Sequence, residues 1–256
     1  MIQILFSIKI SVMQIMTNAI MLLKALTIAF IPVLMIQGIR VKNNILHLAE
    51  PVGARVGLSG SGKPLSILIL GDSAAAGVGV IHQDDALLGQ LIYALQVQYE
   101  ITWKLHAKTG HSTSQVIKSL DDLSEQYFDI VLMSVGVNDV TKFMSANVWI
   151  KKQQKLYAEL MKKFSPKLII ATGVPPMDLF PALPNPLAWL FGQYAKRMNQ
   201  QLKKMVVQTA NMDWIEYDIE KYRALELDMA EDGFHPSKEV YTLWAEQVAD
   251  KIRLKF

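Results

Sequence analysis

The sequence contains no cysteine, and its charged residues are few. Without cysteine, the chain cannot form disulfides, use a thiolate nucleophile or hold a metal through thiolate ligands. Charged residues make up 19% of the chain, and the formal net charge is +3. The lysines and arginines are dispersed rather than clustered, so the sequence does not predict a nucleic-acid partner. No pair of histidines has metal-ligand spacing with a carboxylate, so no metal is expected.

Hydrophobic residues are abundant, at 51% of the chain, and the most apolar stretch is residues 18–38. This stretch carries one charge, Lys24, and one proline, Pro32. Its length is about that needed to cross a bilayer. A membrane anchor, a cleaved signal peptide and a buried helix of the domain are the three interpretations. No small-x-small cleavage site follows, which disfavours the signal peptide. We therefore expect residues 1–40 to be a hydrophobic segment that anchors the protein in a membrane.

The flanking charges bear on the orientation of that anchor. Only Lys9 precedes the apolar stretch, and four basic residues follow it, namely Arg40, Lys42, Arg55 and Lys63. By the positive-inside rule this pattern favours a cytoplasmic catalytic domain. The orientation reverses if Lys9 and Lys24 together form the cytoplasmic flank.

Residues 41–63 are rich in glycine and other breakers, lack a hydrophobic period, and are predicted to be a linker. Within them, residues 57–63 match most of a phosphate-binding P-loop. Pro64 stands where that motif needs serine or threonine, and the segment precedes a strand instead of opening a helix. The motif is therefore interpreted as part of the linker.

Residues 64–256 alternate between apolar runs and amphipathic segments, which predicts one α/β domain with a parallel sheet covered on both faces. Strands are expected to end at residue 70 and to span 101–107, 129–135, 167–171 and 214–217. Helices are expected over 84–98, 146–164 and 187–208, and from about residues 114 and 237. Ligands of such sheets bind beyond the carboxyl ends of the strands.

Candidate catalytic residues follow these predicted strands. Ser73 comes directly after the first strand, and Asp232 and His235 lie on the loop before the last helix. A serine hydroxyl needs an adjacent base to act as a nucleophile, and that base needs an orienting group. Gly110 and Asn138 follow the second and third strands. With the backbone N–H of Ser73, the N–H of Gly110 and the amide of Asn138 are predicted to form an oxyanion hole.

Four sequence blocks, in this order, resemble those of the SGNH hydrolases, also called GDSL-type esterases. They are Gly71-Asp72-Ser73, Gly110, Gly136-Val137-Asn138-Asp139 and Asp232-Gly233-Phe234-His235-Pro236. Ala74 stands where the family name has leucine. The resemblance covers residues 64–256. It implies a flavodoxin-like three-layer α/β/α fold and hydrolysis of acyl esters without a metal or other cofactor.

The predicted substrate is a small-molecule acyl ester, lipid-like or short-chain, as for a lysophospholipase or thioesterase. Pro175 and Phe180 belong to an apolar loop, residues 174–190, that is either a wall for an acyl chain or a proline-stiffened connection. His111 is either a further substrate contact or a polar loop residue. The alternatives are deacetylation of a carbohydrate, a catalytically silent binding domain, and a flavin or nucleotide binder. No phosphate-binding loop supports the last of these. The sequence does not indicate an oligomeric state.

Overall fold

The computed structural model describes residues 18, 21–22, 31–217, 220, 224–225 and 228–256. Within these residues, six strands form one sheet in the order β1-β3-β2-β4-β5-β6. Strands β2 to β6 pair in parallel, and β1 pairs antiparallel with β3. The strands are β1 (Val56–Gly60), β2 (Lys63–Gly71), β3 (Tyr99–Ala107), β4 (Ile130–Ser134), β5 (Leu168–Thr172) and β6 (Met212–Ile215).

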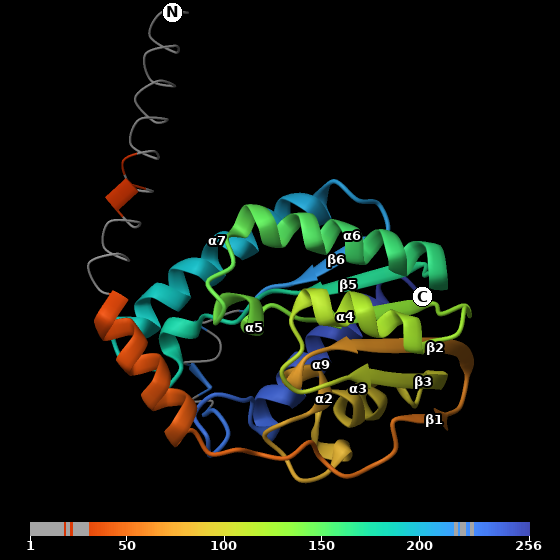
Figure 1. Ribbon diagram of the computed structural model, residues 1–256. Coiled ribbons are helices and arrows are strands. Elements are labelled where there is room, and N and C mark those ends of the chain that lie inside the picture. The colour runs from red at the N-terminus through yellow and green to blue at the C-terminus, as the bar shows by residue number, and fades with distance from the viewer. Residues whose placement is uncertain (1–17, 19–20, 23–30, 218–219, 221–223, 226–227) are drawn as a thin grey trace, which may run out of the picture.

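Helices cover both faces of this sheet (Figure 1). The α-helices are α2 (Ser73–Ala76), α3 (Leu87–Leu95), α4 (Thr113–Ser119), α5 (Val137–Val140), α6 (Ala146–Phe164), α7 (Leu187–Val207) and α9 (Lys238–Arg253). Short 3-10 turns are η1 (Gln83–Asp85), η2 (Leu120–Asp122) and η3 (Met177–Leu179). The predicted three-layer α/β/α fold is confirmed.

Successive side chains of a buried strand point to opposite faces of the sheet, so the domain has two hydrophobic cores. Leu68 and Leu70 of β2 face the core shared with α4, α6 and α7, whereas Ile67 and Ile69 face the core shared with α3 and α9. All four side chains are at most 2% exposed. A strand buried on both faces reads as a continuous apolar run, which is why residues 65–70 could be assigned from sequence.

β1 lies within residues 41–63, where the sequence analysis expects a linker. Its two glycines obscure the strand pattern, but Gly57 has a packing reason. A Cβ at Gly57 would lie 2.4 Å from the ring of Trp103 on β3, so a side chain at this position would collide with the indole. The glycine lets an edge strand pass closely over an aromatic ring.

The predicted membrane anchor is wrong. None of the described helices combines the length and the apolar composition that crossing a membrane requires. Residues 1–17, 19–20 and 23–30 of the expected anchor lie outside the described residues. Residues 31–44 are helical, and Leu34 is buried in the core that α7 shares. Gln37 of this helix donates to the carbonyl of Asn185 and accepts from the N–H of Leu187, so these residues pack against the start of α7 (Figure 1).

Candidate active site

Ser73 is the first residue of α2 and follows β2 after a sharp turn at Asp72. Gly71 ends β2 so close to β4 that a Cβ on it would lie 2.0 Å from the carbonyl oxygen of Ser134. Asp72 caps the N-terminus of α2, since its carboxylate accepts the N–H of Ala74 at 3.2 Å. The strand and the cap together present the Ser73 side chain at the carboxyl edge of the sheet.

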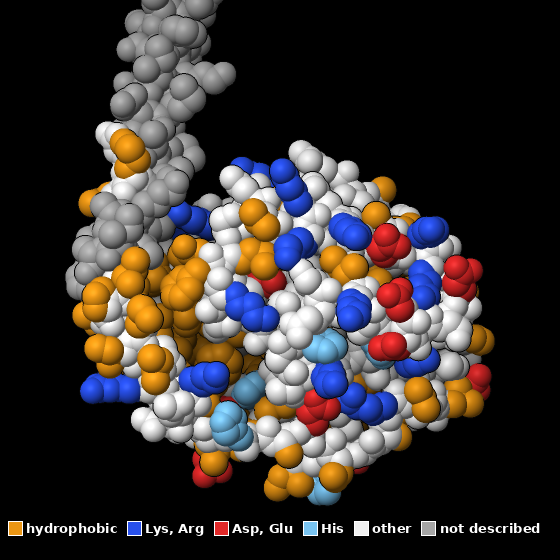
Figure 2. Space-filling view, in the orientation of Figure 1, with side chains coloured by type: hydrophobic (Ala, Val, Ile, Leu, Met, Phe, Trp, Pro, Cys, Tyr) orange, Lys and Arg blue, Asp and Glu red, His pale blue; other side chains and the backbone are white. Residues whose placement is uncertain are grey.

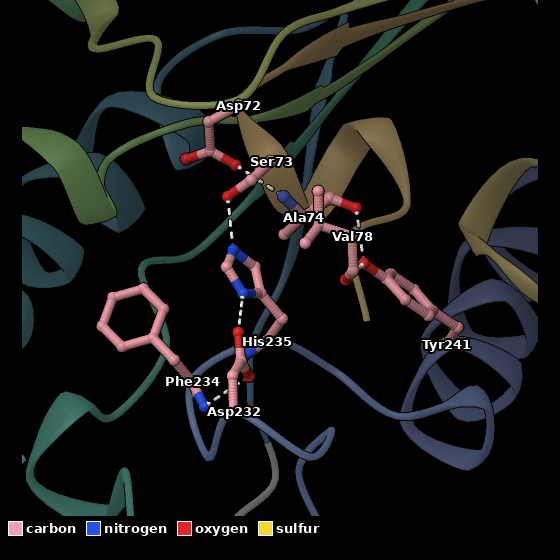
Figure 3. A network of polar contacts seen from close by, with 8 residues as sticks. All are labelled: Asp72, Ser73, Ala74, Val78, Asp232, Phe234, His235 and Tyr241. Carbon is pink, nitrogen blue, oxygen red and sulfur yellow. Dashed lines mark hydrogen bonds and ion pairs between the residues drawn. The ribbon is translucent and has the colours of Figure 1, made fainter. Parts of the chain in front are cut away.

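Tyr241, from α9, forms hydrogen bonds with the backbone around α2. Its phenol oxygen lies 2.7 Å from the carbonyl oxygen of Val78 and 3.1 Å from that of Ala74 (Figure 3). Burial raises the pKa of Tyr241 well above its ordinary value, so the phenol stays a hydrogen-bond donor. The sequence analysis interprets Tyr241 as a core residue. It is buried in the core and also holds the segment that carries Ser73.

Ser73, His235 and Asp232 form a line of hydrogen bonds (Figure 3). The Nε2 atom of His235 lies 2.8 Å from the Oγ atom of Ser73. The Nδ1 atom of the same ring lies 2.5 Å from the Oδ2 atom of Asp232. This order places the imidazole between the hydroxyl and the carboxylate, as a general base with an orienting partner requires.

The second carboxylate oxygen of Asp232 fixes the loop that carries the imidazole. It accepts the backbone N–H groups of Phe234 and His235, both at 2.9 Å. Burial alone would raise the pKa of Asp232, but these bonds and the one from the imidazole outweigh it and lower the pKa below its ordinary value. The carboxylate is therefore ionised at neutral pH, and it favours the tautomer of His235 that carries its proton on Nδ1.

The predicted oxyanion donors follow strand ends that lie in register. Gly71 of β2 pairs with Ala107 of β3 on one side and with Ser134 of β4 on the other. Ser73, Gly110 and Asn138 come shortly after these three residues, so their turns share one edge of the sheet. Gly110 has φ +82°, a left-handed conformation that favours glycine.

Asn138 and His111 contact each other directly. The side-chain amide nitrogen of Asn138 donates to the backbone carbonyl of His111 at 3.1 Å. His111 therefore contacts Asn138 through its backbone and not through its ring. The surroundings of its ring lower the pKa of His111, first through burial and then through the positive charge of Lys108.

A cavity of about 540 Å³ opens beside Ser73 and His235. Most of its wall is apolar, and Figure 2 shows a hollow with hydrophobic walls on this face of the molecule. The predicted contacts Pro175 and Phe180 both line the cavity. The described residues that line the cavity do not include Gly110, His111 or Asn138. Most apolar side chains of the wall come from α5, from residues 174–181 and from the loop around His235, and α2 and α9 add Ala74 and Val240. They include Val137, Val174, Leu179, Met229 and Phe234.

Phe234 is the wall residue that sequence reasoning should have singled out. It stands between Asp232 and His235 in the sequence, so its position was known once that block was recognised. Its ring packs edge-on against Phe180 with the centroids 5.1 Å apart. It also contacts the imidazole of His235, with the centroids 5.3 Å apart. The apolar wall and the candidate base therefore belong to one packed unit.

A three-layer α/β fold with a serine, an imidazole and a carboxylate aligned at the strand ends is the architecture of a serine hydrolase. The chain belongs to the GDSL-like Lipase/Acylhydrolase family, whose model matches residues 69–243. This confirms the family predicted from the four sequence blocks and makes the chain a carboxylic ester hydrolase.

Solved structures share the fold at low sequence identity. A member of the lipolytic protein G-D-S-L family from Veillonella parvula is 16% identical, with a TM-score of 0.60 over 75% of this chain and 99% of that one. The esterase EstA from Pseudoalteromonas is 20% identical, with a TM-score of 0.56 over 74% and 97%. The acetylxylan esterase Axe2 from Geobacillus stearothermophilus is 18% identical, with a TM-score of 0.55 over 76% and 96%. Among curated proteins, no sequence matches the chain.

Proposed function

We propose that the protein is a serine esterase that hydrolyses acyl esters through an acyl-enzyme, with Ser73 as nucleophile, His235 as general base and Asp232 as orienting group. One observation carries the proposal: Ser73 and His235, hydrogen-bonded in line with Asp232, lie in the wall of a largely apolar cavity. A nucleophile beside an apolar pocket suits a substrate whose acyl group is hydrophobic.

The geometry suggests the order of proton transfers. Oγ of Ser73 attacks the ester carbonyl carbon while its proton passes to Nε2 of His235. The N–H groups of Ser73 and Gly110 and the amide of Asn138 stabilise the oxyanion that forms. The protonated imidazole then gives its proton to the leaving alcohol. Water, activated by the same imidazole, releases the acid from Ser73 and restores the hydroxyl.

The cavity walls favour a lipid-like acyl chain over a carbohydrate. Near Ser73, apolar side chains such as Leu179, Phe180 and Phe234 dominate the lining. Each methylene moved from water into such a site contributes at most about 0.8 kcal/mol. The rate constant kcat/KM should therefore rise about two- to fourfold per methylene between acetyl and octanoyl esters.

A series of p-nitrophenyl esters from acetate to dodecanoate tests this proposal, beside acetylated xylo-oligosaccharides. We expect hydrolysis that improves with chain length and disappears in Ser73→Ala. Ser134→Ala is the matched control, because Ser134 also lines the cavity but does not contact His235 in the described network. Release of acetate from the sugars with no chain-length effect would favour the carbohydrate O-deacetylase instead. Hydrolysis of neither class would refute the proposal.

A further inference from the structure

Thr113, the first residue of α4, lies at the centre of a buried polar cluster apart from the aligned triad. Its backbone N–H and its hydroxyl both donate to the Oδ2 atom of Asp139, at 2.9 and 2.7 Å. The same hydroxyl oxygen accepts the indole N–H of Trp149 at 3.1 Å and the amide of Gln153 at 3.0 Å. One hydroxyl group therefore joins α4, α5 and α6.

This cluster is buried. Thr113, Asp139 and Trp149 are 0% exposed, and Gln153 is 1% exposed. The second carboxylate oxygen of Asp139 has no hydrogen-bond partner within the described part of the chain, so Thr113 supplies the bonds that hold this carboxylate. Loss of the hydroxyl would leave several buried polar groups without their partner.

The cluster adjoins two of the proposed oxyanion donors. Asn138 directly precedes Asp139, and Gly110 lies three residues before Thr113. The amide nitrogen of Asn138 spends one of its two hydrogens on the carbonyl of His111. That bond turns the second hydrogen in a defined direction. The direction is useful only if the turn at residues 110–113 keeps its place relative to Asn138.

We propose that Thr113 is a positioning residue: its hydroxyl, held by Trp149 and Gln153, fixes the turn of Gly110 against the turn of Asn138 so that both donors point at one oxygen. The inference rests on the proposed function, because it concerns the same oxyanion. Oxyanion donors act over 2.7–3.1 Å, and a misplacement of about 1 Å can cost about 10²-fold in rate. A small shift of either turn therefore lowers turnover without weakening the binding of substrate.

The chain offers a matched control away from the carboxyl ends of β2 and β4, where the proposed oxyanion donors lie. The N–H and hydroxyl of Ser66 both donate to Oδ2 of Asp129, at 2.9 and 2.8 Å. Ser66 lies in the first half of β2, and Asp129 directly precedes β4, so this bridge is far along the strands from Ser73. Ser66→Ala removes the same kind of hydroxyl–carboxylate bond without touching the oxyanion turns.

The test uses the full chain with Thr113→Val, Thr113→Ser and Ser66→Ala. The first readout is kcat and KM on a p-nitrophenyl ester. The second is the rate at which diethyl p-nitrophenyl phosphate modifies Ser73. In that reaction the Oγ–P bond forms, the bond from phosphorus to p-nitrophenolate breaks, and the proton of Ser73 passes to His235. The phosphoryl oxygen gains negative charge in the same hole, so this readout does not depend on which ester is the substrate.

We expect Thr113→Val to lower kcat and the modification rate by about tenfold or more, with KM within about twofold. Thr113→Ser keeps the hydroxyl and should restore both rates. Ser66→Ala should unfold at lower urea concentration and keep both rates. If Thr113→Val does not fold, Gln153→Met tests the inference instead, because it removes one donor to the Thr113 hydroxyl and keeps the bridge to Asp139. For this variant we expect both rates to fall about threefold.

The inference is overturned if Thr113→Val has the same rates as Ser66→Ala. If Thr113→Val does not fold, the same comparison is made with Gln153→Met. Either result would leave the proposed function intact. A wild-type chain that is modified at Ser73 but hydrolyses no ester would refute the proposed function alone, and the modification rates would still decide the role of Thr113. A wild-type chain that is neither modified nor active would overturn both.

Discussion

The Nε2 atom of His235 lies 2.8 Å from the Oγ atom of Ser73, across a sequence separation of 162 residues. Neither residue reaches the other through local structure. Ser73 is placed by the end of β2 and the cap of α2, and His235 by the carboxylate of Asp232 and the packing of Phe234. The contact therefore joins segments near the two ends of the α/β domain.

Replacing Asp232 with asparagine should lower kcat by about 10⁴-fold, because the amide no longer favours the imidazole tautomer that can accept the proton of Ser73. Turnover of a p-nitrophenyl ester at neutral pH measures the loss. Asp228→Asn is the control: Asp228 lines the same cavity but is exposed and does not contact the imidazole in the described network. Equal activity in both variants would contradict the role of Asp232.

Asn138→Ala should lower kcat by about 10²–10³-fold, since it removes one oxyanion donor. Its stability should change little, because Asn138 is only partly buried and makes one side-chain bond to the carbonyl of His111. Urea unfolding and ester turnover separate the two effects. Full activity in the alanine variant would remove Asn138 from the oxyanion hole.

Leu179→Ser should lower kcat/KM for octanoyl esters by about five- to tenfold and leave acetyl esters nearly unchanged, because Leu179 lines the cavity and offers contact only to a longer chain. Leu179 is 42% exposed, so the substitution should not unfold the domain. Leu254→Ser, at a position 88% exposed and after α9, removes the same side chain away from the cavity. A loss for octanoyl esters of the same size in both variants would exclude Leu179 from the acyl site.

Asp72 should make the stability of the protein fall between pH 5 and pH 8. Burial, with a smaller contribution from the nearby Asp139, raises the pKa of Asp72 from 3.8 to about 7, although backbone hydrogen bonds and His235 act to lower it. The native state holds the proton to higher pH than the unfolded chain does. The stabilisation is therefore full below about pH 4 and is lost as the pH rises through about 7, a change on the order of 2–4 kcal/mol.

Urea unfolding of the wild type and Asp72→Asn at pH 5 and pH 8 checks this expectation. The asparagine cannot ionise, so the stability of the wild type minus that of the variant should decrease as the pH rises. Asp129→Asn is the control. Burial alone would raise the pKa of Asp129, but Lys167 and Ser66 bring it down to about 2, so Asp129 is ionised at both pH values. For that pair the difference should stay constant; a constant difference for Asp72 as well would refute the expectation.

Much of the fold follows from patterns of buried residues that the sequence displays directly. The expected helix over residues 146–164 coincides with α6, and the apolar runs ending at residues 70 and 135 become β2 and β4. β1 could not be predicted, because its glycines obscure the strand pattern, and Gly57 is needed against Trp103, a contact between segments far apart in the sequence. The short helices α2 and α5 were missed because a single turn has no hydrophobic period.

The candidate site likewise contains residues that the sequence predicts and residues that it does not. Ser73, Asp232 and His235 could be named from sequence because a hydroxyl, an imidazole and a carboxylate each have a distinctive chemistry at a recognisable turn. Val137 and Met229 could not, because nothing in their sequence context shows that they line a cavity, which depends on tertiary packing. Residues 18–38 were misread because apolar composition alone cannot separate a membrane anchor from a helix that, like residues 31–44, buries Leu34 against its own domain.

The order of the catalytic elements along the chain affects how the protein is made. A nascent chain that has emerged only as far as β5 already holds Ser73, Gly110 and Asn138, but not His235, the proposed base. Under the proposed mechanism, the hydroxyl of Ser73 gains this base only when the segment before α9 has left the ribosome and docked. The proposed activity therefore belongs to the completed domain and not to an unfinished polypeptide.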